Sequence, residues 1–244
     1  MPPSRTIQTA SAAQRALQPL GDPERAQHSA RYFKTGPGEY AEGDQFRGIR
    51  VPELRRVARA ARGMALGETL KLLRSKWHED RLVALIILVA MYQRAQPKER
   101  ERIVAAYMRN TRYIDNWDLV DSSASYILGP HLENRSRATL YKLARSNNIW
   151  ERRIAIITTA HFHRAGNAAD TLAIAELLLD DDHDLIHKAV GWMLREVGDR
   201  CGRNTLTRFL DSHVSRMPRT MLRYAIEHFD PAGRTRYLAV KRTA

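Results

Sequence analysis

The segment Arg81-Leu-Val-Ala-Leu-Ile-Ile-Leu-Val-Ala-Met-Tyr-Gln93 is apolar on almost every side of a helix. A helix that is hydrophobic all round has to be surrounded by other parts of the protein, so this segment predicts an inner helix. Its apolar run is about half the length that a membrane-spanning helix needs. The segment therefore predicts a buried helix of a folded domain and not a membrane span.

Four further segments place an alanine among apolar residues in a similar way. A recurrence of roughly 35 to 40 residues, with a more variable helix between the repeats, predicts an all-α, HEAT-like helical-repeat solenoid (an α-α superhelix). A generic helical bundle that happens to contain these alanines is the alternative. In a solenoid the inner helices would line a concave face. The alanines, spaced by 40, 31, 34 and 36 residues, are Ala84, Ala124, Ala155, Ala189 and Ala225.

Apolar periodicity and breaker residues divide the rest of the chain, and no convincing alternation predicts a strand. We expect a flexible N-terminal segment over residues 1–20 and a single HEAT-like repeat domain over residues 21–244. The predicted helices cover residues 51–62, 81–93, 117–128, 150–163, 185–197 and 217–229. Breaks are predicted where Gly and Pro occur, at Gly21–Pro23, Gly129–Pro130, Gly166, Gly198 and Pro231.

Charge indicates the kind of partner. Forty Lys and Arg residues against 27 Asp and Glu residues give a net charge of +13. This surplus favours polyanions, above all nucleic acid, although an acidic membrane surface would be attracted too. The first residues lack the apolar core of a secretion signal, and the single cysteine, Cys201, excludes an intrachain disulfide. Both features fit a reducing cytoplasm, and a monomer is the simple expectation.

One segment, Asn116-Trp-Asp-Leu-Val-Asp-Ser122, sets Trp117 and Asp121 four residues apart on one helical face. Asp115 is expected to cap this helix, and Asp118 to lie in its first turn. Asp121 lies deeper. Flanked by the indole and by Arg153 of a neighbouring repeat, it would stabilise positive charge on a ligand. The alternative is a structural Asp121–Arg153 bridge between repeats.

The other tryptophans need separate interpretations. Lys188, Trp192 and Arg195 fall on one helical face, and a face with two cations is not expected to be buried. Trp192 is therefore predicted to be partly exposed, where its ring would attract a cationic ligand. Trp77 and Trp150 are predicted to serve packing.

A Gly-rich loop of about fifteen residues, Lys34–Gly48, precedes the helix that starts at Val51. It lacks the Gly-Lys-Ser/Thr ending of a phosphate-binding loop, so nucleotide binding is not predicted there. Long ordered loops are often functional. This loop is expected to contact a partner's backbone through Arg47 and Arg50.

Metal or cofactor chemistry is not predicted. His183 and His187 are spaced like the ligands of a zinc-protease helix, but Asp184 replaces the Glu of that pattern and no third ligand is apparent. No nucleophile motif occurs, and Cys201 has no candidate catalytic partner. We expect no cofactor and no metal.

Three motifs in order resemble those of the AlkD-type DNA alkylation repair proteins, which are HEAT-like-repeat DNA glycosylases. The resemblance runs from about Arg31 to Phe229. It is strongest over Trp117–Ser122, over Ser146–Arg153 and over Lys188–Glu196. Only the three together make the resemblance specific.

The resemblance implies a site and an activity. Asp121 would be the catalytic carboxylate and Trp117 an aromatic contact to the lesion, while Arg153 and Trp192 match two further family positions. Lys188, Arg195, Arg47 and Arg50 are expected to bind DNA. The implied activity is hydrolysis of the N-glycosidic bond of N3- and N7-alkylated purines in double-stranded DNA, without a metal or cofactor.

The implied architecture is a concave basic groove that holds the duplex with the lesion left near the stack. The Lys34–Gly48 loop is longer than its equivalent in the best-known members, which leaves the choice of lesion open. A non-catalytic solenoid that binds branched or distorted DNA is the main alternative. A protein-binding HEAT scaffold is a third, and the basic surplus disfavours it.

Overall fold

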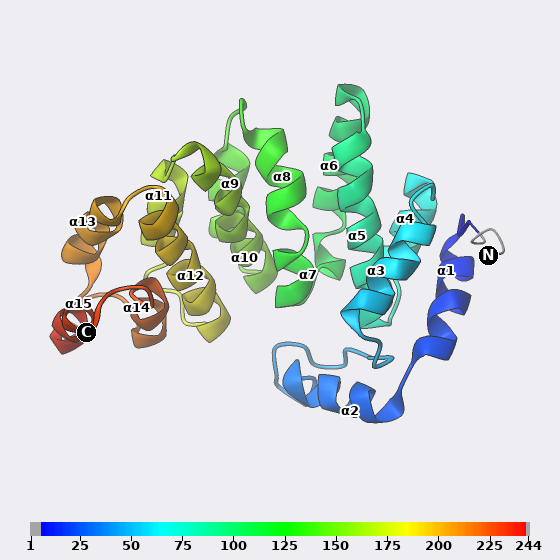
Figure 1. The fold of residues 1–244 in the computed structure, drawn as a ribbon, viewed down its shortest axis with the longest axis horizontal. Helices are drawn as coiled ribbons and strands as arrows, with labels where there is room; N and C mark the ends of the chain where they lie inside the picture. Colours follow the sequence, from blue (N-terminus) through cyan, green and yellow to red (C-terminus); the bar gives the residue numbers. More distant parts are fainter. Residues whose placement is uncertain (1–5, 243–244) are drawn as a thin grey trace. The chain divides into compact units, whose positions relative to one another are not determined.

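The computed structural model describes residues 6–242 (Figure 1). Within this range it contains fifteen α-helices and three short 3₁₀ helices, and a single isolated bridge between Gln45 and Trp77 is its only β geometry. The all-α prediction is confirmed. No helix in this range is long and apolar enough to cross a membrane.

In chain order the helices are α1 (Ala10–Leu17), η1 (Gln18–Leu20), α2 (Pro23–Tyr32), α3 (Val51–Ala60), α4 (Leu66–Leu73), α5 (His78–Arg94), α6 (Pro97–Arg109), η2 (Thr111–Tyr113), α7 (Trp117–Asp121), α8 (Ala124–Leu132), α9 (Ala138–Ala144), α10 (Ile149–Thr158), η3 (Thr159–Ala165), α11 (Ala169–Leu177), α12 (Asp184–Arg200), α13 (Arg203–His213), α14 (Arg219–Ala225) and α15 (Pro231–Ala239).

The chain divides into two compact units, Met1–Ser123 and Ala124–Ala244, where the sequence predicted one continuous repeat domain. The N-terminal segment predicted to be flexible contains helix α1. This helix packs against α3, α4 and α5, and its Ala13 and Leu17 are fully buried. Ala13 and Leu17 thus belong to the core of the first unit, and residues 1–5 lie outside the described range. The domain boundary at residue 20 stays a prediction.

Helix α5 is the centre of the first unit and confirms the prediction of an inner helix. Its apolar residues from Val83 to Leu88 are buried on nearly every side, and it packs against α1, α3, α4, α6 and α7. The helix begins three residues earlier than predicted, at His78. Its first turn is polar but buried, so its side chains need partners.

The helix predicted over residues 117–128 is interrupted. Helix α7 ends at Asp121 and α8 begins at Ala124. The buried Ser123 hydroxyl donates to the Leu119 carbonyl at 2.6 Å and lies 3.0 Å from the Tyr107 hydroxyl. Serine side chains that bond to the backbone in this way compete with the regular helix pattern, which explains the break.

In the second unit, helices α8, α10, α12 and α14 contact one another in succession. Each of these helices contains one of the predicted alanines, and all four are buried, so the pattern marks the faces along which these helices pack. They are Ala124, Ala155, Ala189 and Ala225. The superhelical course of the whole chain stays a prediction.

Two of the predicted breaks are wrong. Gly129–Pro130 lies inside α8, and Gly198 lies inside α12. A Cβ added at Gly129 would come within 2.3 Å of the His161 Cβ, so this glycine permits close packing against η3. Gly166, by contrast, has φ 69° and ends η3 as predicted, because a left-handed backbone favours glycine.

Candidate functional site

Helix α7 starts at Trp117 because Asn116 caps it. The buried Asn116 side chain accepts a hydrogen bond from the Trp117 backbone N–H at 2.8 Å. The prediction that Asp115 is the cap is wrong, because Asp115 lies one residue too early and forms an ion pair with Arg81, at 3.1 Å. Asp118 lies in the first turn as predicted.

Trp117 and Asp121 occupy the first and last positions of α7, and both are half-buried. Leu119 and Val120 are fully buried, so they anchor the helix in the first unit. Burial raises the pKa of the Tyr107 hydroxyl far above its ordinary value, and the negative charge of Asp121 adds to this effect. The Asp121 carboxyl therefore lies close to the core of the first unit.

An aromatic cluster supports Trp117 from one side. It comprises Tyr32, Phe33, Phe46, His78 and Trp117. Phe33 stacks on Trp117 at 5.3 Å between ring centroids and on Phe46 at 5.0 Å, and Phe46 stacks on His78 at 4.5 Å. Tyr32 meets the Trp117 ring edge-on at 6.1 Å. These contacts fix the plane of the indole.

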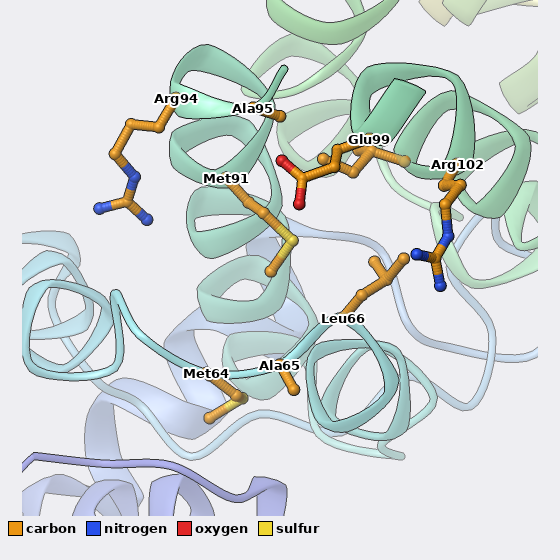
Figure 2. Close-up of a pocket in the computed structure, with 9 residues that line it drawn as sticks. Met64, Ala65, Leu66, Met91, Arg94, Ala95, Glu99 and Arg102 are labelled. Atoms are coloured by element: carbon orange, nitrogen blue, oxygen red, sulfur yellow. The ribbon is translucent and has the colours of Figure 1, made fainter. Parts of the chain in front are cut away.

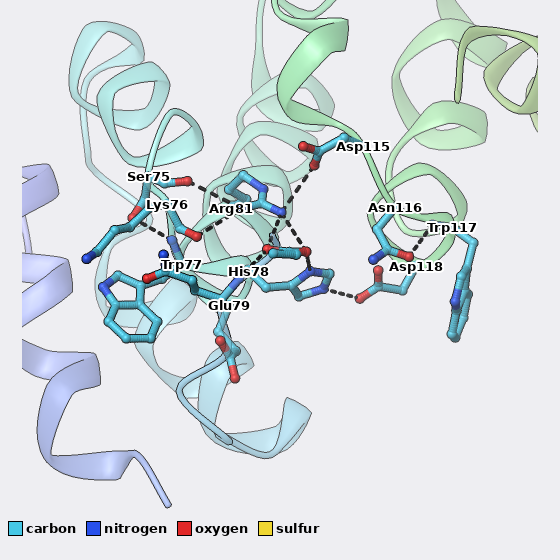
Figure 3. Close-up of polar contacts among 12 residues, drawn as sticks. Ser75, Lys76, Trp77, His78, Glu79, Arg81, Asp115, Asn116, Trp117 and Asp118 are labelled. Atoms are coloured by element: carbon cyan, nitrogen blue, oxygen red, sulfur yellow. Dashed lines mark hydrogen bonds and ion pairs between the residues drawn. The ribbon is translucent and has the colours of Figure 1, made fainter. Parts of the chain in front are cut away.

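A charged network built around the buried side chains of His78 and Arg81 adjoins this cluster (Figure 3). We call Asp44, His78, Arg81, Asp115 and Asp118 the carboxylate–histidine network. His78 bonds through Nδ1 to Asp44 and through Nε2 to Asp118, each at 2.8 Å. Arg81 donates to both oxygens of Asp44 at 2.9 Å and pairs with Asp115. The network joins the 34–48 loop, helix α5 and the start of α7.

The network favours the cationic form of His78. Burial disfavours the charged imidazolium, but the nearby carboxylates of Asp118 and Asp44 outweigh that effect and raise the pKa of His78 to about 9. The same charges act on Asp44. Although burial alone would raise the pKa of its carboxyl, His78 and Arg81 together lower it. Burial raises the pKa of Asp115.

The Gly-rich loop is fixed to the start of α5. Arg47 donates to Asp80 through Nε at 2.8 Å and through Nη2 at 3.1 Å, and its guanidinium lies over the Trp77 ring at 4.6 Å. Glu79 accepts hydrogen bonds from the backbone N–H groups of residues 47, 48 and 49. Arg47 thus already has a buried partner, whereas the side chain of Arg50 is exposed.

Sequence reasoning missed the carboxylate–histidine network, although a signal was present. The apolar helix α5 opens with the polar run His78-Glu79-Asp80-Arg81. Polar side chains in an inner helix have to be paired, because an unpaired charge in a protein interior is costly. That run therefore predicts buried partners from elsewhere in the chain.

A basic face on α3 was also missed. Leu54, Val57 and Ala58 are buried, and the opposite side of the helix and its following turn is exposed and carries arginines. The helical spacing of apolar and basic residues was the available signal. The α3 basic face consists of Arg55, Arg56, Arg59 and Arg62.

In the second unit, Trp192 is half-buried, as predicted. Its indole N–H donates to Glu196 at 3.3 Å. Lys188 pairs with Asp184 at 2.7 Å, and Arg195 forms an ion pair with Glu227. The cations beside Trp192 therefore each have a carboxylate partner on the protein.

Close helix packing lies behind Trp192. A Cβ added at Gly191 would come within 2.4 Å of the Met221 carbonyl oxygen, so only glycine lets α12 approach α14 this closely. The sequence Gly191-Trp192 thus combines a packing residue with a half-exposed indole. Trp150 on α10 is buried, which confirms its predicted packing role.

Arg153 is buried in the second unit, and only 5% of its surface is exposed. Its Nη1 donates to the Leu185 carbonyl at 2.7 Å, so it fixes the first turn of α12. Asp121 belongs to the first unit and Arg153 to the second, and their predicted relation stays a prediction.

The spaced histidines have structural contacts. His183 caps α12 by accepting a hydrogen bond from the Leu185 backbone N–H at 3.1 Å, and His187 bonds to the Asp181 carbonyl oxygen. Over residues 6–242, no three His, Cys, Asp or Glu side chains are grouped so that they would hold a metal ion.

The described part of the first unit contains pockets on different sides of α5. One of about 310 Å³ is lined by His78 and Asp118 of the network, by Phe33 and Phe46, and by cations on its rim. Another, of about 410 Å³, lies among α5, α6 and the turn before α4 (Figure 2). Its walls include Met64, Met91 and Arg102, and it shares no lining residue with the site around α7.

Comparison with known proteins identifies the family. The sequence profile of the DNA alkylation repair enzymes matches residues 13–229. The chain belongs to the DNA alkylation repair enzyme family. This confirms the resemblance found in the sequence, and it makes DNA the expected substrate class of the family.

One solved structure shows that the fold is shared with a further protein described as a DNA alkylation repair enzyme. A predicted DNA alkylation repair enzyme from Enterococcus faecalis superimposes with a TM-score of 0.67 and 18% identity, over 87% of this chain and 98% of the other. At this identity the likeness concerns the fold alone. A search of curated proteins gave no match.

Proposed function

We propose that the chain is a DNA glycosylase that hydrolyses the N-glycosidic bond of N3- and N7-alkylated purines in duplex DNA. The observation that carries this proposal is the face of α7. It presents a half-buried carboxylate, Asp121, four residues from a half-buried indole, Trp117, in a chain of the DNA alkylation repair family.

Alkylation at N3 or N7 makes the purine cationic, so the base is already a good leaving group. Breaking the C1′–N bond returns the bond's electron pair to the base, which leaves neutral, and positive charge develops on the sugar. Asp121 would stabilise that charge electrostatically and direct a water to C1′. The water oxygen bonds to C1′ and loses a proton, so the chemistry requires no cofactor.

Trp117 would contact the lesion through its ring face. An indole is the strongest cation–π partner among side chains, and an alkylated purine is a flat cation. The stacked rings of the aromatic cluster hold the Trp117 plane in place before the DNA arrives. In the second unit, Trp192 and Arg153 are the other two residues proposed for the lesion, and Arg153 would first have to leave the Leu185 carbonyl.

Binding of the duplex would rest on cations. The concave basic groove of a HEAT-like solenoid is part of this proposal, with Lys188, Arg195, Arg47 and Arg50 as phosphate contacts. Three of the four are paired with carboxylates in the protein alone. DNA would have to exchange those partners, whereas Arg50 is exposed.

A second candidate is a non-catalytic protein that binds distorted or branched DNA, and the exposed arginines of the α3 basic face would serve it as well. Both candidates bind DNA, and only the glycosylase releases a base. Free purine measured after incubation with methylated duplex separates them. We expect release by the wild type and its loss in Asp121→Asn. Tight binding without release by either protein would favour the second candidate.

A further inference from the structure

We propose that the carboxylate–histidine network is a positioning device for the reaction, in which the His78 imidazolium ties Asp44 to Asp118 and so sets helix α7, with Trp117 and Asp121, in its working orientation. This inference rests on the proposed function and adds residues to it that do not touch the substrate. Asp44, His78 and Asp118 are positioning residues.

The geometry supports a bridge and not a chance contact. Both ring nitrogens of His78 bond to carboxylates at 2.8 Å, and only a doubly protonated imidazole donates to two acceptors. The His78 and Asp44 side chains are 3% and 7% exposed. Two carboxylates facing one neutral ring at these distances would repel each other, so the cation holds the loop and the helix together.

Helix α7 depends on this bridge because it is short. Five residues make too little internal hydrogen bonding to hold an orientation alone. Its first turn is held by Asn116, by the Asp118 bond to His78 and by Phe33 against Trp117. Asp121 lies one turn further along, so a shift of Asp118 would move the carboxylate.

Other charged groups also face His78. Arg81, from the same helix, neutralises Asp44, and Asp115 pairs with Arg81. Glu79 bonds to the loop backbone. The 310 Å³ pocket next to the ring also carries charged and titratable side chains on its wall, which are Arg25, His28 and Arg50. Asp44 and Asp118 are the two that bond to the ring, so they set its charge.

The test uses Asp118→Asn, which keeps the size of the side chain but removes the charge that faces His78. Asp170→Asn is the matched control. Asp170 is a largely buried carboxylate of the second unit, paired with Arg137 and Tyr141 and separate from the proposed site. For each protein, single-turnover release of purine from methylated duplex and affinity for the duplex are measured separately at pH 7.5.

We expect Asp118→Asn to slow release by about tenfold or more, with duplex affinity changed by less than about twofold, because misplacement of a catalytic group acts on the chemical step. Asp170→Asn should change neither the rate of release nor the affinity for the duplex. A structural role alone would not move the pH profile. Wild-type release should fall as pH rises through about 9, and this alkaline limb should lie at lower pH in Asp118→Asn.

Nitrogen-15 NMR of histidine-labelled protein reports the bridge directly. At pH 7.5 we expect both His78 nitrogens to carry protons in the wild type. Equal rates for wild type and Asp118→Asn, or equal losses in Asp118→Asn and Asp170→Asn, would overturn the proposal. If Asp118→Asn does not fold, the wild type alone provides the test. The pH at which its release rate falls is then compared with the pKa of His78 measured by NMR, and a difference of more than about one pH unit also overturns the proposal.

Failure of the proposed function gives a different pattern. A wild type that binds duplex but releases no base at any pH would refute the proposed glycosylase function. The positioning role of His78 is then tested by measuring the NMR resonance of the Trp117 indole N–H. A shift of this resonance that follows the His78 titration supports the positioning of α7, and an unchanged resonance overturns it.

Discussion

Replacing His78 by Gln should change how the stability of the protein depends on pH. In the folded protein, the pKa of His78 is raised from 6.5 to about 9. The folded state therefore keeps a proton that the unfolded chain has released in this range. The stabilisation is fully present below pH 6.5, is lost progressively as pH rises to about 9, and is absent above it.

The size of the effect follows from the pKa difference. At about 1.4 kcal/mol for each pKa unit, the shift of His78 corresponds to about 3 kcal/mol of unfolding free energy. Asp44 does not add to the slope in this window, because its pKa is lowered from 3.8 and its contribution is lost only at acid pH. Gln keeps an amide NH2 that can donate hydrogen bonds to the network but cannot carry the charge.

Urea denaturation followed by circular dichroism, at intervals between pH 6.5 and 9, measures the unfolding free energy. We expect the wild type to lose about 3 kcal/mol over this range and His78→Gln to start lower and stay nearly flat. Asp170→Asn is the control and should keep the wild-type slope. A flat wild-type profile, or the same slope in His78→Gln, would refute the assignment of a cationic His78.

Three further predictions concern DNA and packing. Replacing the exposed Arg55, Arg56 and Arg59 together by Gln should reduce the slope of log DNA affinity against log salt concentration by about three, since each phosphate contact contributes about 0.9. An unchanged slope would exclude the α3 basic face from the interface with DNA. Trp192→Ala should lower selectivity for cationic lesions more than affinity for undamaged duplex, and equal losses in competition binding would contradict its role at the lesion. Gly191→Ala should destabilise the protein by about 1–3 kcal/mol, because the new methyl group would lie 2.4 Å from the Met221 carbonyl oxygen. An unaltered midpoint of urea denaturation would show that α12 and α14 can separate at no cost.

Local patterns in the sequence predicted much of the fold. The all-α class follows from apolar periodicity, because a face that repeats every three or four residues must be covered. The inner position of α5 follows from a segment that is apolar on almost every side, and the burial of Trp150 is the usual state of a tryptophan. Gly129 and Gly198 were misread as breaks. Their role is set by a neighbouring helix that approaches closely, and sequence spacing does not report that neighbour.

The carboxylate–histidine network was out of reach for a different reason. Asp44 is 34 residues from His78, and Asp118 is 40 residues from it, so both bonds are made by the tertiary fold. The same fold decides between Asp115 and Asn116 as the cap of α7. Either side chain is a suitable cap, but Arg81 engages Asp115 and leaves the position to Asn116.

The central claim is that the Asp121 carboxylate stabilises the charge that develops as an alkylated purine leaves. Single-turnover release of 7-methylguanine from duplex DNA, for the wild type beside Asp121→Asn, tests it most directly. We expect the substitution to slow release by about 10²–10³-fold, as for loss of a preorganised electrostatic stabiliser, with duplex affinity retained. Release at equal rates by both proteins would contradict the role of Asp121, and the catalytic group would have to be sought elsewhere.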